Sequence, residues 1–104
     1  MKEYLKLIDQ YLKKELPFDK FTESIHFLYA KDPNLNNLSK GESDFVYHVY
    51  EKSTYAEKPE YLPKNDPDRK HGLIDSEQYY DWLKNEKQKN ITFWDKYRNE
   101  TKVE

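Results

Sequence analysis

The side chains of this chain that could do chemistry are three histidines and a large set of carboxylates. His26, His48 and His71 are far apart in the sequence, and none has the His-x-x-x-His or His-Glu-x-x-His spacing that puts two zinc ligands on one helical face. His26 and His48 lie beside apolar positions, which is typical of partly buried structural histidines. His71 precedes a glycine in a loop and is expected to be exposed. The histidines therefore indicate neither a metal centre nor a catalytic base.

The carboxylates do not form a recognisable reactive pattern either. Asp66 with Asp68 and Asp75 with Glu77 resemble fragments of a calcium loop, but the Asp-x-Asp-x-Asp-Gly spacing is absent and Pro67 interrupts the first pair. Acid–base catalysis needs two carboxyl groups in one cleft whose surroundings separate their pKa values. The chain has only two glycines and no Gly-rich phosphate loop. We therefore predict a protein that is not an enzyme and that uses no metal or cofactor.

Composition narrows the classes of protein to which the chain can belong. The chain has 104 residues, which predicts a single domain over 1–104, and it has no cysteine, which excludes a disulfide scaffold and thiolate chemistry. Neither a signal-peptide h-region nor a membrane-spanning apolar run is present, so a soluble cytoplasmic protein is expected. Its basic residues are sixteen lysines and two arginines on a net charge of −2, a poor footprint for nucleic-acid binding.

Aromatic residues must build much of the core. Only 36% of the residues are hydrophobic and 37% are charged, but ten Tyr, five Phe and two Trp are present. Each ring can bury about 150–250 Å², so a few rings replace many aliphatic side chains.

The spacing of apolar residues predicts the elements that must hold this core. A 3.6-residue period predicts helices over 3–16 and 17–31, the first ending before Pro17. Ser39 and Glu42 have the spacing of a capping box, which predicts a third helix to about residue 55. No strand alternation is visible.

A long loop is predicted between the third and fourth helices. Residues 56–72 contain Pro59, Pro63 and Pro67, a spacing that no ordinary helix tolerates. Asp75 and Gln78 then form a second capping-box pattern that starts a fourth helix. The predicted fold is all-α, a small four- or five-helix bundle with this proline-containing loop, in which residues 89–104 form a C-terminal tail or a short helix.

Charge is distributed unevenly along the chain. Between residues 41 and 83, ten Asp and Glu stand against five Lys and Arg, a balance of −5, whereas residues 1–40 sum to +1 and residues 84–104 to +2. An acidic surface with interspersed tyrosines favours a basic protein partner, because carboxylates speed the encounter and tyrosine rings supply contact area. The predicted partner-binding residues are Glu57, Glu60, Tyr61, Asp66, Asp68, Asp75, Glu77 and Asp81.

The order of these features resembles a known family. Its motifs are Phe21 and Leu28 in a helical pair, Leu38-Ser39-x-x-Glu42 opening a third helix, an acidic Tyr/Pro/Asp loop, and Leu73-Ile74-Asp75-x-x-Gln78-Tyr79 opening a fourth. Over about residues 5–88 the chain is similar to the small bacterial colicin-like immunity proteins, in particular those like the colicin D immunity protein. Residues 89–104 lie outside the resemblance.

The resemblance implies an all-helical protein that binds a cognate toxin. The partner would be a basic nuclease domain that cuts tRNA, and acidic residues, here Asp66, Asp68 and Asp75 among others, would take the place of the RNA backbone. Three alternatives remain open. One is an immunity protein of the pediocin-like bacteriocin type acting at a membrane receptor, for which the lysines and aromatics of residues 84–94 are the only hint. The others are a nucleic-acid-binding or regulatory adaptor and a small hydrolase.

Overall fold

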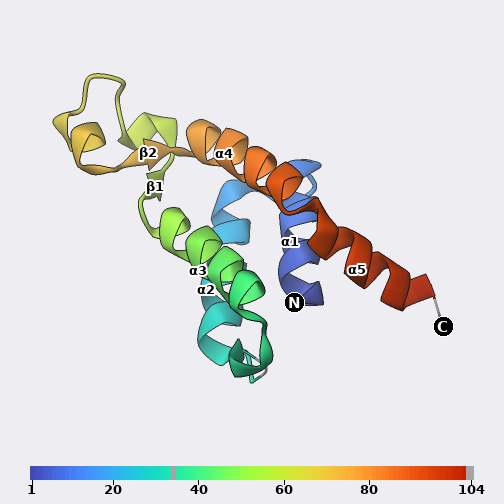
Figure 1. The fold of residues 1–104 in the computed structure, drawn as a ribbon. Coiled ribbons are helices and arrows are strands. Elements are labelled where there is room, and N and C mark those ends of the chain that lie inside the picture. Colours follow the sequence, from blue (N-terminus) through green and yellow to red (C-terminus); the bar gives the residue numbers. More distant parts are fainter. Residues whose placement is uncertain (34, 103–104) are drawn as a thin grey trace.

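The computed structural model of the chain describes residues 1–33 and 35–102, with the side chains of 98–102 excepted; residues 103 and 104 of the predicted tail lie outside this range. The described residues form five α-helices (Figure 1). They are α1 (Lys2–Leu12), α2 (Phe18–Lys31), α3 (Lys40–Thr54), α4 (Ser76–Lys89) and α5 (Ile91–Lys102). The all-α prediction is confirmed, as is the long proline-containing loop between the third and fourth helices.

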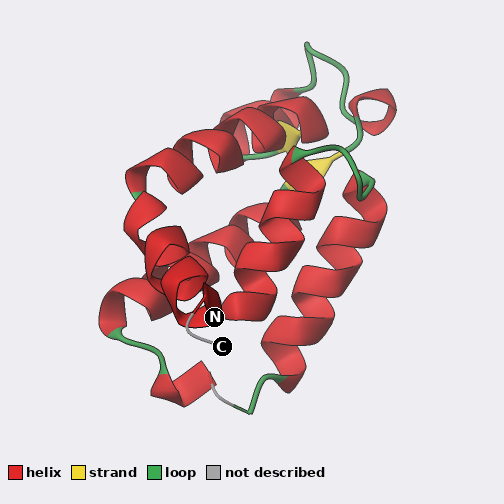
Figure 2. Cartoon of the chain, turned by 90° about the vertical axis from the view of Figure 1, so that its right-hand side faces the viewer, coloured by secondary structure: helices red, strands yellow, loops and turns green. Residues whose placement is uncertain are grey.

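Less of that loop is irregular than its prolines predict. It begins with β1 (Ala56–Glu57) and ends with β2 (Ile74–Asp75), and these strands pair in parallel with Ala56 opposite Ile74 and Glu57 opposite Asp75. The sequence predicted no strand, because two residues are too few to show alternation. We call residues 57–73, from the second residue of β1 to the start of β2, the strap. Strands and strap lie together at one end of the helical body, away from both termini (Figure 2).

Aromatic rings fill the centre of the helical body, as the composition predicts. Tyr79 on α4 has no exposed surface, and its ring lies 6.1 Å from that of Phe21 and 6.2 Å from that of Tyr11. Tyr11 stacks on Phe21 with ring centroids 4.5 Å apart. The hydroxyl of Tyr79 donates a hydrogen bond of 3.0 Å to the carbonyl oxygen of Val49, so this fully buried polar group is satisfied.

The first helix ends four residues earlier than predicted. Lys14 has a φ of 63°, and its N–H donates to the carbonyl of Tyr11 while that of Glu15 donates to Gln10. This is the Schellman arrangement that ends many helices, here built without the usual glycine. Proline at position 17 marked only the last possible end of the helix, and a lysine in the left-handed region has no sequence signal.

Because a β-carbon in the left-handed region is strained, we expect Lys14→Gly to stabilise the protein. The strain relieved is about 1–2 kcal/mol, and the extra unfolded-state freedom of glycine offsets about 0.4–1 kcal/mol of it. A net gain of about 0.5 kcal/mol corresponds to a rise in Tm of roughly 2–4 °C, measurable by thermal unfolding. Lys13→Gly is the matched control, since Lys13 has a φ of −85° and should lose stability. An equal response of the two variants would contradict this interpretation of the turn.

Helix α5 is part of the packed body, so the short-helix alternative for the C-terminal segment is the correct one. Trp94 is 5% exposed, and its indole N–H donates to Asp9 on α1, which also accepts from the ammonium of Lys87 at 2.8 Å. One turn later, the Tyr97 hydroxyl donates to Glu42 at the start of α3. These contacts join α5 to α1 and α3, and no local pattern could predict them.

Candidate protein-binding site

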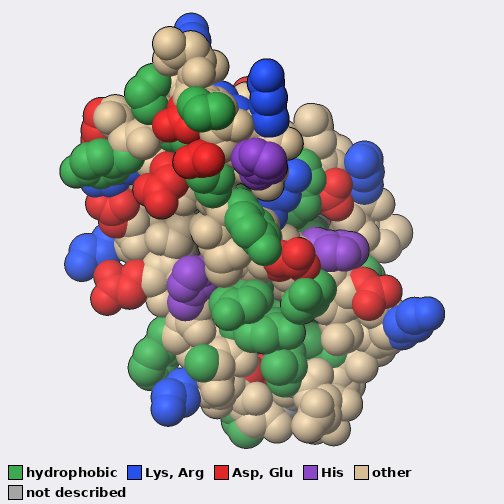
Figure 3. All heavy atoms as spheres, turned by 90° about the vertical axis from the view of Figure 1, so that its left-hand side faces the viewer, with side chains coloured by type: hydrophobic (Ala, Val, Ile, Leu, Met, Phe, Trp, Pro, Cys, Tyr) green, Lys and Arg blue, Asp and Glu red, His purple; other side chains and the backbone are tan. Residues whose placement is uncertain are grey.

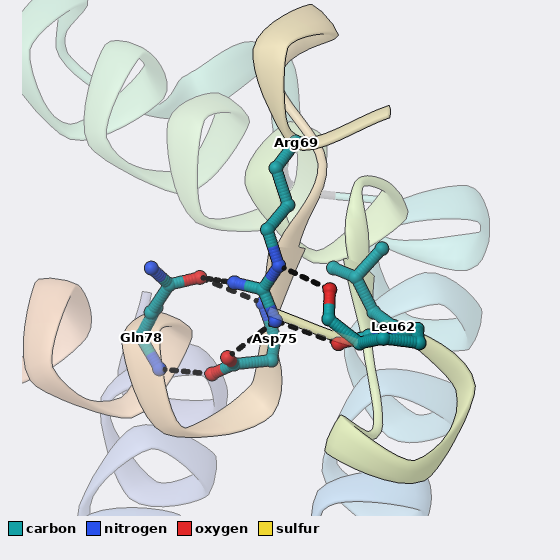
Figure 4. Close-up of polar contacts among 5 residues, drawn as sticks. Leu62, Arg69, Asp75 and Gln78 are labelled. Atoms are coloured by element: carbon teal, nitrogen blue, oxygen red, sulfur yellow. Dashed lines mark hydrogen bonds and ion pairs between the residues drawn. The ribbon is translucent and has the colours of Figure 1, made fainter. Parts of the chain in front are cut away.

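A single arginine holds the strap in shape. Arg69 donates from Nε to the carbonyl of Pro63 at 2.9 Å and from Nη2 to the carbonyl of Leu62 at 2.6 Å. Its Nη2 also lies 3.0 Å from Asp75 Oδ2, and its Nη1 lies 3.0 Å from Gln78 Oε1. Figure 4 shows the guanidinium between the strap backbone and the first turn of α4. One planar group with several donors therefore fastens the middle of the strap to the helix that follows it.

The strap is also shaped from within. Pro59 and Pro67 each begin a short 3₁₀ helix, Pro59–Tyr61 and Pro67–His71, because proline is tolerated in a first turn whose N–H groups have no partner. The side chain of Asp66 caps the second of these by accepting from the N–H of Asp68 at 2.8 Å. Gly72 ends it with a φ of 101°, a conformation that favours glycine. Leu62, which is 2% exposed, is the buried apolar side chain of the strap.

Asp75, predicted as a partner contact, is engaged inside the protein. It is 8% exposed; its Oδ1 accepts from the N–H of Gln78, and its Oδ2 faces Arg69. Gln78 returns a bond to the Asp75 N–H, which completes the predicted capping box. Burial alone would raise the pKa of this carboxyl, but the bonds from Gln78 and Arg69 together outweigh it and lower the pKa below its ordinary value. Asp75 is therefore a positioning residue for the strap.

Stability should fall in acid, because two buried carboxylates have lowered pKa values. For Glu42, burial also opposes ionisation, but the bonds from Ser39 and Tyr97 prevail and lower its pKa. A group whose folded pKa is lowered contributes stability above its unfolded pKa, about 4 for these groups, and loses it as the pH falls through the folded value. We expect the urea concentration at the unfolding midpoint to fall as the pH drops below about 4. In the double variant Glu42→Gln, Asp75→Asn, the slope of this midpoint against pH should be shallower. An unchanged slope in the double variant would contradict the assignment.

The structure divides the other predicted contacts into two groups. Those on β1 and the strap are exposed or half-buried: Glu57, Glu60, Tyr61, Asp66 and Asp68. Acidic and hydrophobic side chains intermingle at this end of the face in Figure 3. The second group, Glu77 and Asp81, lies exposed on α4 and lines a separate groove of about 420 Å³ with Tyr11, Lys14 and Tyr80.

The surface of the strap carries more net negative charge than its sequence alone indicates. Residues 57–71 contain four acidic and four basic residues, which cancel. Arg69 is paired with Asp75, however, and the Lys58 ammonium lies 2.6 Å from Asp19 on α2. The remaining carboxylates are Glu57, Glu60, Asp66 and Asp68, and the remaining cations are Lys64 and Lys70. Two of the four cations are thus neutralised by residues outside the segment, which leaves its surface at about −2.

A groove lies between α3 and α4 that was not predicted from the sequence. It has a volume of about 430 Å³ and meets the end of the strap at Gly72. Its other lining residues are His48, Glu51, Lys52, Tyr55, Trp82 and Glu86. The signal that could have found it is periodicity: positions 48, 51, 52 and 55 share one face of a helix, and 82 and 86 are one turn apart.

The histidines lie on the surface. His26 and His48, expected to be partly buried, are exposed, and so is His71, as predicted. His26 Nε2 lies 3.0 Å from the hydroxyl of Ser53, but that hydroxyl donates its proton to the carbonyl of Tyr50 at 2.6 Å. The ring must therefore donate to the serine, so the pair is not a nucleophile with its base. Among the side chains that the structure describes, those of residues 1–33 and 35–97, no three from His, Asp or Glu are close enough to hold a metal ion.

Within the described ranges, no helix has both the length and the apolarity needed to cross a bilayer.

Other proteins add nothing to this description. Comparison of the chain with protein-family models, with curated proteins and with solved structures finds no match in any of the three.

Proposed function

We propose that this protein binds and neutralises a cognate bacterial toxin, as its resemblance to the colicin-like immunity proteins implies. The observation that carries the proposal is the strap: a surface segment fixed by Arg69 that turns its carboxylates outward while its arginine is used internally. The proposed target is the active site of a basic nuclease domain of the tRNA-cutting kind.

A fixed strap is suited to this task for an energetic reason. Ordering a loop upon binding costs free energy that reduces affinity, whereas a segment already held by hydrogen bonds avoids most of that cost. Carboxylates at Glu57, Glu60 and Asp68 can then meet lysine and arginine side chains that otherwise bind RNA phosphates. Charge complementarity of this kind also speeds association at low salt.

Exposed tyrosines give the same surface the means to bind a protein rather than a free ion. Tyr61 on the strap is 70% exposed, Tyr47 on α3 is 46% exposed, and Tyr55, directly after α3, is 48% exposed. Tyrosine buries much area at little conformational cost and is enriched among the residues that dominate binding energy. A protein partner therefore explains both the carboxylates and the rings.

The test is growth rescue. Co-expression with the product of the gene immediately upstream should allow cells to survive if that product is the toxin. Glu57→Lys, Glu60→Lys and Asp68→Lys combined should abolish the rescue, because all three side chains are exposed and none of them takes part in the hydrogen bonds that hold the strap. Asp66 and Asp75 are left intact because they shape the strap.

The matched control reverses two exposed carboxylates elsewhere, Glu15→Lys and Glu23→Lys, on α2 and the turn before it. Rescue should persist in this control, and urea unfolding should show that both variants are folded. Rescue that survives reversal of the strap would contradict the proposal, as would an upstream gene that encodes a metabolic enzyme.

A further inference from the structure

The groove between α3 and α4 has the chemistry of a site for a cationic side chain. Trp82 presents its ring to the groove, and the chain's own Lys52 ammonium lies 5.2 Å from the ring centroid. Glu51 on α3 and Glu86 on α4 contribute carboxylates from the two helices. The face of an indole attracts cations electrostatically, and Lys52 shows that this face is open to one.

The groove contains more negative charge than its lysine compensates. Among the described residues, Glu51 forms no ion pair; its carboxylate accepts a hydrogen bond from the Tyr47 hydroxyl. In the part of the chain that the structure describes, the one ion pair of Glu86 is with Lys89, at 3.5 Å, and that lysine side chain is 71% exposed and lies outside the groove lining. Counted over the lining residues alone, two carboxylates against Lys52 leave a balance of −1 beside an aromatic ring, which disfavours an anion and is complementary to a cation.

We propose that this groove receives an arginine side chain of the protein partner, whose guanidinium replaces Lys52 on Trp82 and pairs with Glu51 and Glu86. The inference rests on the proposed function, in that it names a contact of the same basic partner. Arginine fits better than lysine because its guanidinium is planar, stacks on aromatic rings, is weakly hydrated and bonds carboxylates with two parallel N–H groups. The groove adjoins the strap at Gly72, so one partner can reach both.

The two tryptophans provide a test that needs no toxin. Blocked Gly-Arg-Gly peptide is titrated into ¹⁵N-labelled protein while the indole N–H resonances are followed, with Trp82→Phe used for assignment. The Trp82 signal should shift and saturate, and the Trp94 signal should stay in place because that ring is 5% exposed and bonded to Asp9. Gly-Lys-Gly should bind several-fold more weakly and Gly-Glu-Gly should cause no shift. Equal shifts from the Arg and Glu peptides, or none from either, would overturn the proposal.

Lys52 provides a second test, because its ammonium would compete with the arginine for the ring of Trp82. Lys52→Ala should bind the Arg peptide about twofold to fivefold more tightly, from the loss of a cation–π contact of about 0.5–1 kcal/mol. Lys84→Ala, an exposed lysine of α4 outside the groove lining, is the control and should change nothing. Glu51→Gln with Glu86→Gln should abolish saturable binding. Weaker binding by Lys52→Ala would overturn the inference even if growth rescue succeeds. Peptide binding without growth rescue would support this site and contradict the assignment of the partner as a toxin.

Discussion

Arg69→Ala should lower the free energy of unfolding by about 2–4 kcal/mol, because a single side chain supplies the contacts that hold the strap. Hydrogen bonds that involve a charged group contribute about 1.5–3 kcal/mol, and breaking a buried ion pair costs about 3–5 kcal/mol. The Arg69 and Asp75 side chains are 18% and 12% exposed, so solvent screens the pair only in part. The carbonyls of Leu62 and Pro63 would also lose their donor.

Urea unfolding measures this loss, and hydrogen exchange locates it. Amides of the strap and of Ile74, which donates to Tyr55, should exchange faster in Arg69→Ala, while those of α1 should change least. Arg69→Lys should recover less than half of the loss, because one ammonium cannot reach the same four acceptors. Lys70→Ala, the exposed neighbour, is the control and should cost under about 0.5 kcal/mol. Equal stability of the Arg69→Ala and Lys70→Ala variants would refute the anchoring role.

Tyr79→Ala should cost still more, about 3–5 kcal/mol, as is usual for removing a large buried ring. Its side chain has no exposed surface and meets rings from α1, α2 and its own helix: Tyr11, Phe18, Phe21 and Trp82. The cavity would lie where three helices join, and neighbouring rings that are themselves held by packing can fill it only partly.

Tyr79→Phe separates the ring from its hydroxyl. It should cost about 1–3 kcal/mol, because the carbonyl of Val49 would lose the side-chain donor it has in the core. Burial also raises the pKa of Tyr79, so this hydroxyl should stay protonated and donating in alkaline solution. Tyr61→Ala on the exposed strap is the matched ring deletion and should leave the urea midpoint nearly unchanged. A midpoint for Tyr79→Ala as high as that of Tyr61→Ala would contradict this account of the core.

Local sequence was sufficient where a local interaction determines the structure. Both capping boxes formed as predicted, Ser39 with Glu42 and Asp75 with Gln78, because each needs only residues three positions apart. The end of α1 was predicted wrongly because Lys14 takes a conformation that its residue type disfavours. Side-chain periodicity gave the helices but carried no signal for the two-residue strands.

The site was harder to predict than the fold, because it depends on contacts that are distant in sequence. Arg69 appeared to be one of the cations that offset the acidic segment, and only the folded chain pairs it with Asp75 and the strap carbonyls. The pairing of Lys58 with Asp19 has the same origin. Asp75 satisfied two patterns at once, a helix cap and an acidic contact, and its 8% exposure shows it in the first role. Counting charge along the sequence does not reveal which charges face outward.

The proposed role of the strap's outward carboxylates is to bind a basic toxin domain. Its most direct test is calorimetric titration of the purified catalytic domain encoded upstream with the wild-type protein, with the Glu57→Lys, Glu60→Lys and Asp68→Lys triple variant, and with the Glu15→Lys and Glu23→Lys control. We expect wild-type and control binding that weakens as salt rises, and a loss of at least about 100-fold in the strap variant, the size expected when three charge contacts become repulsive. Equal affinity of the strap variant and the control would contradict the proposed role of these carboxylates.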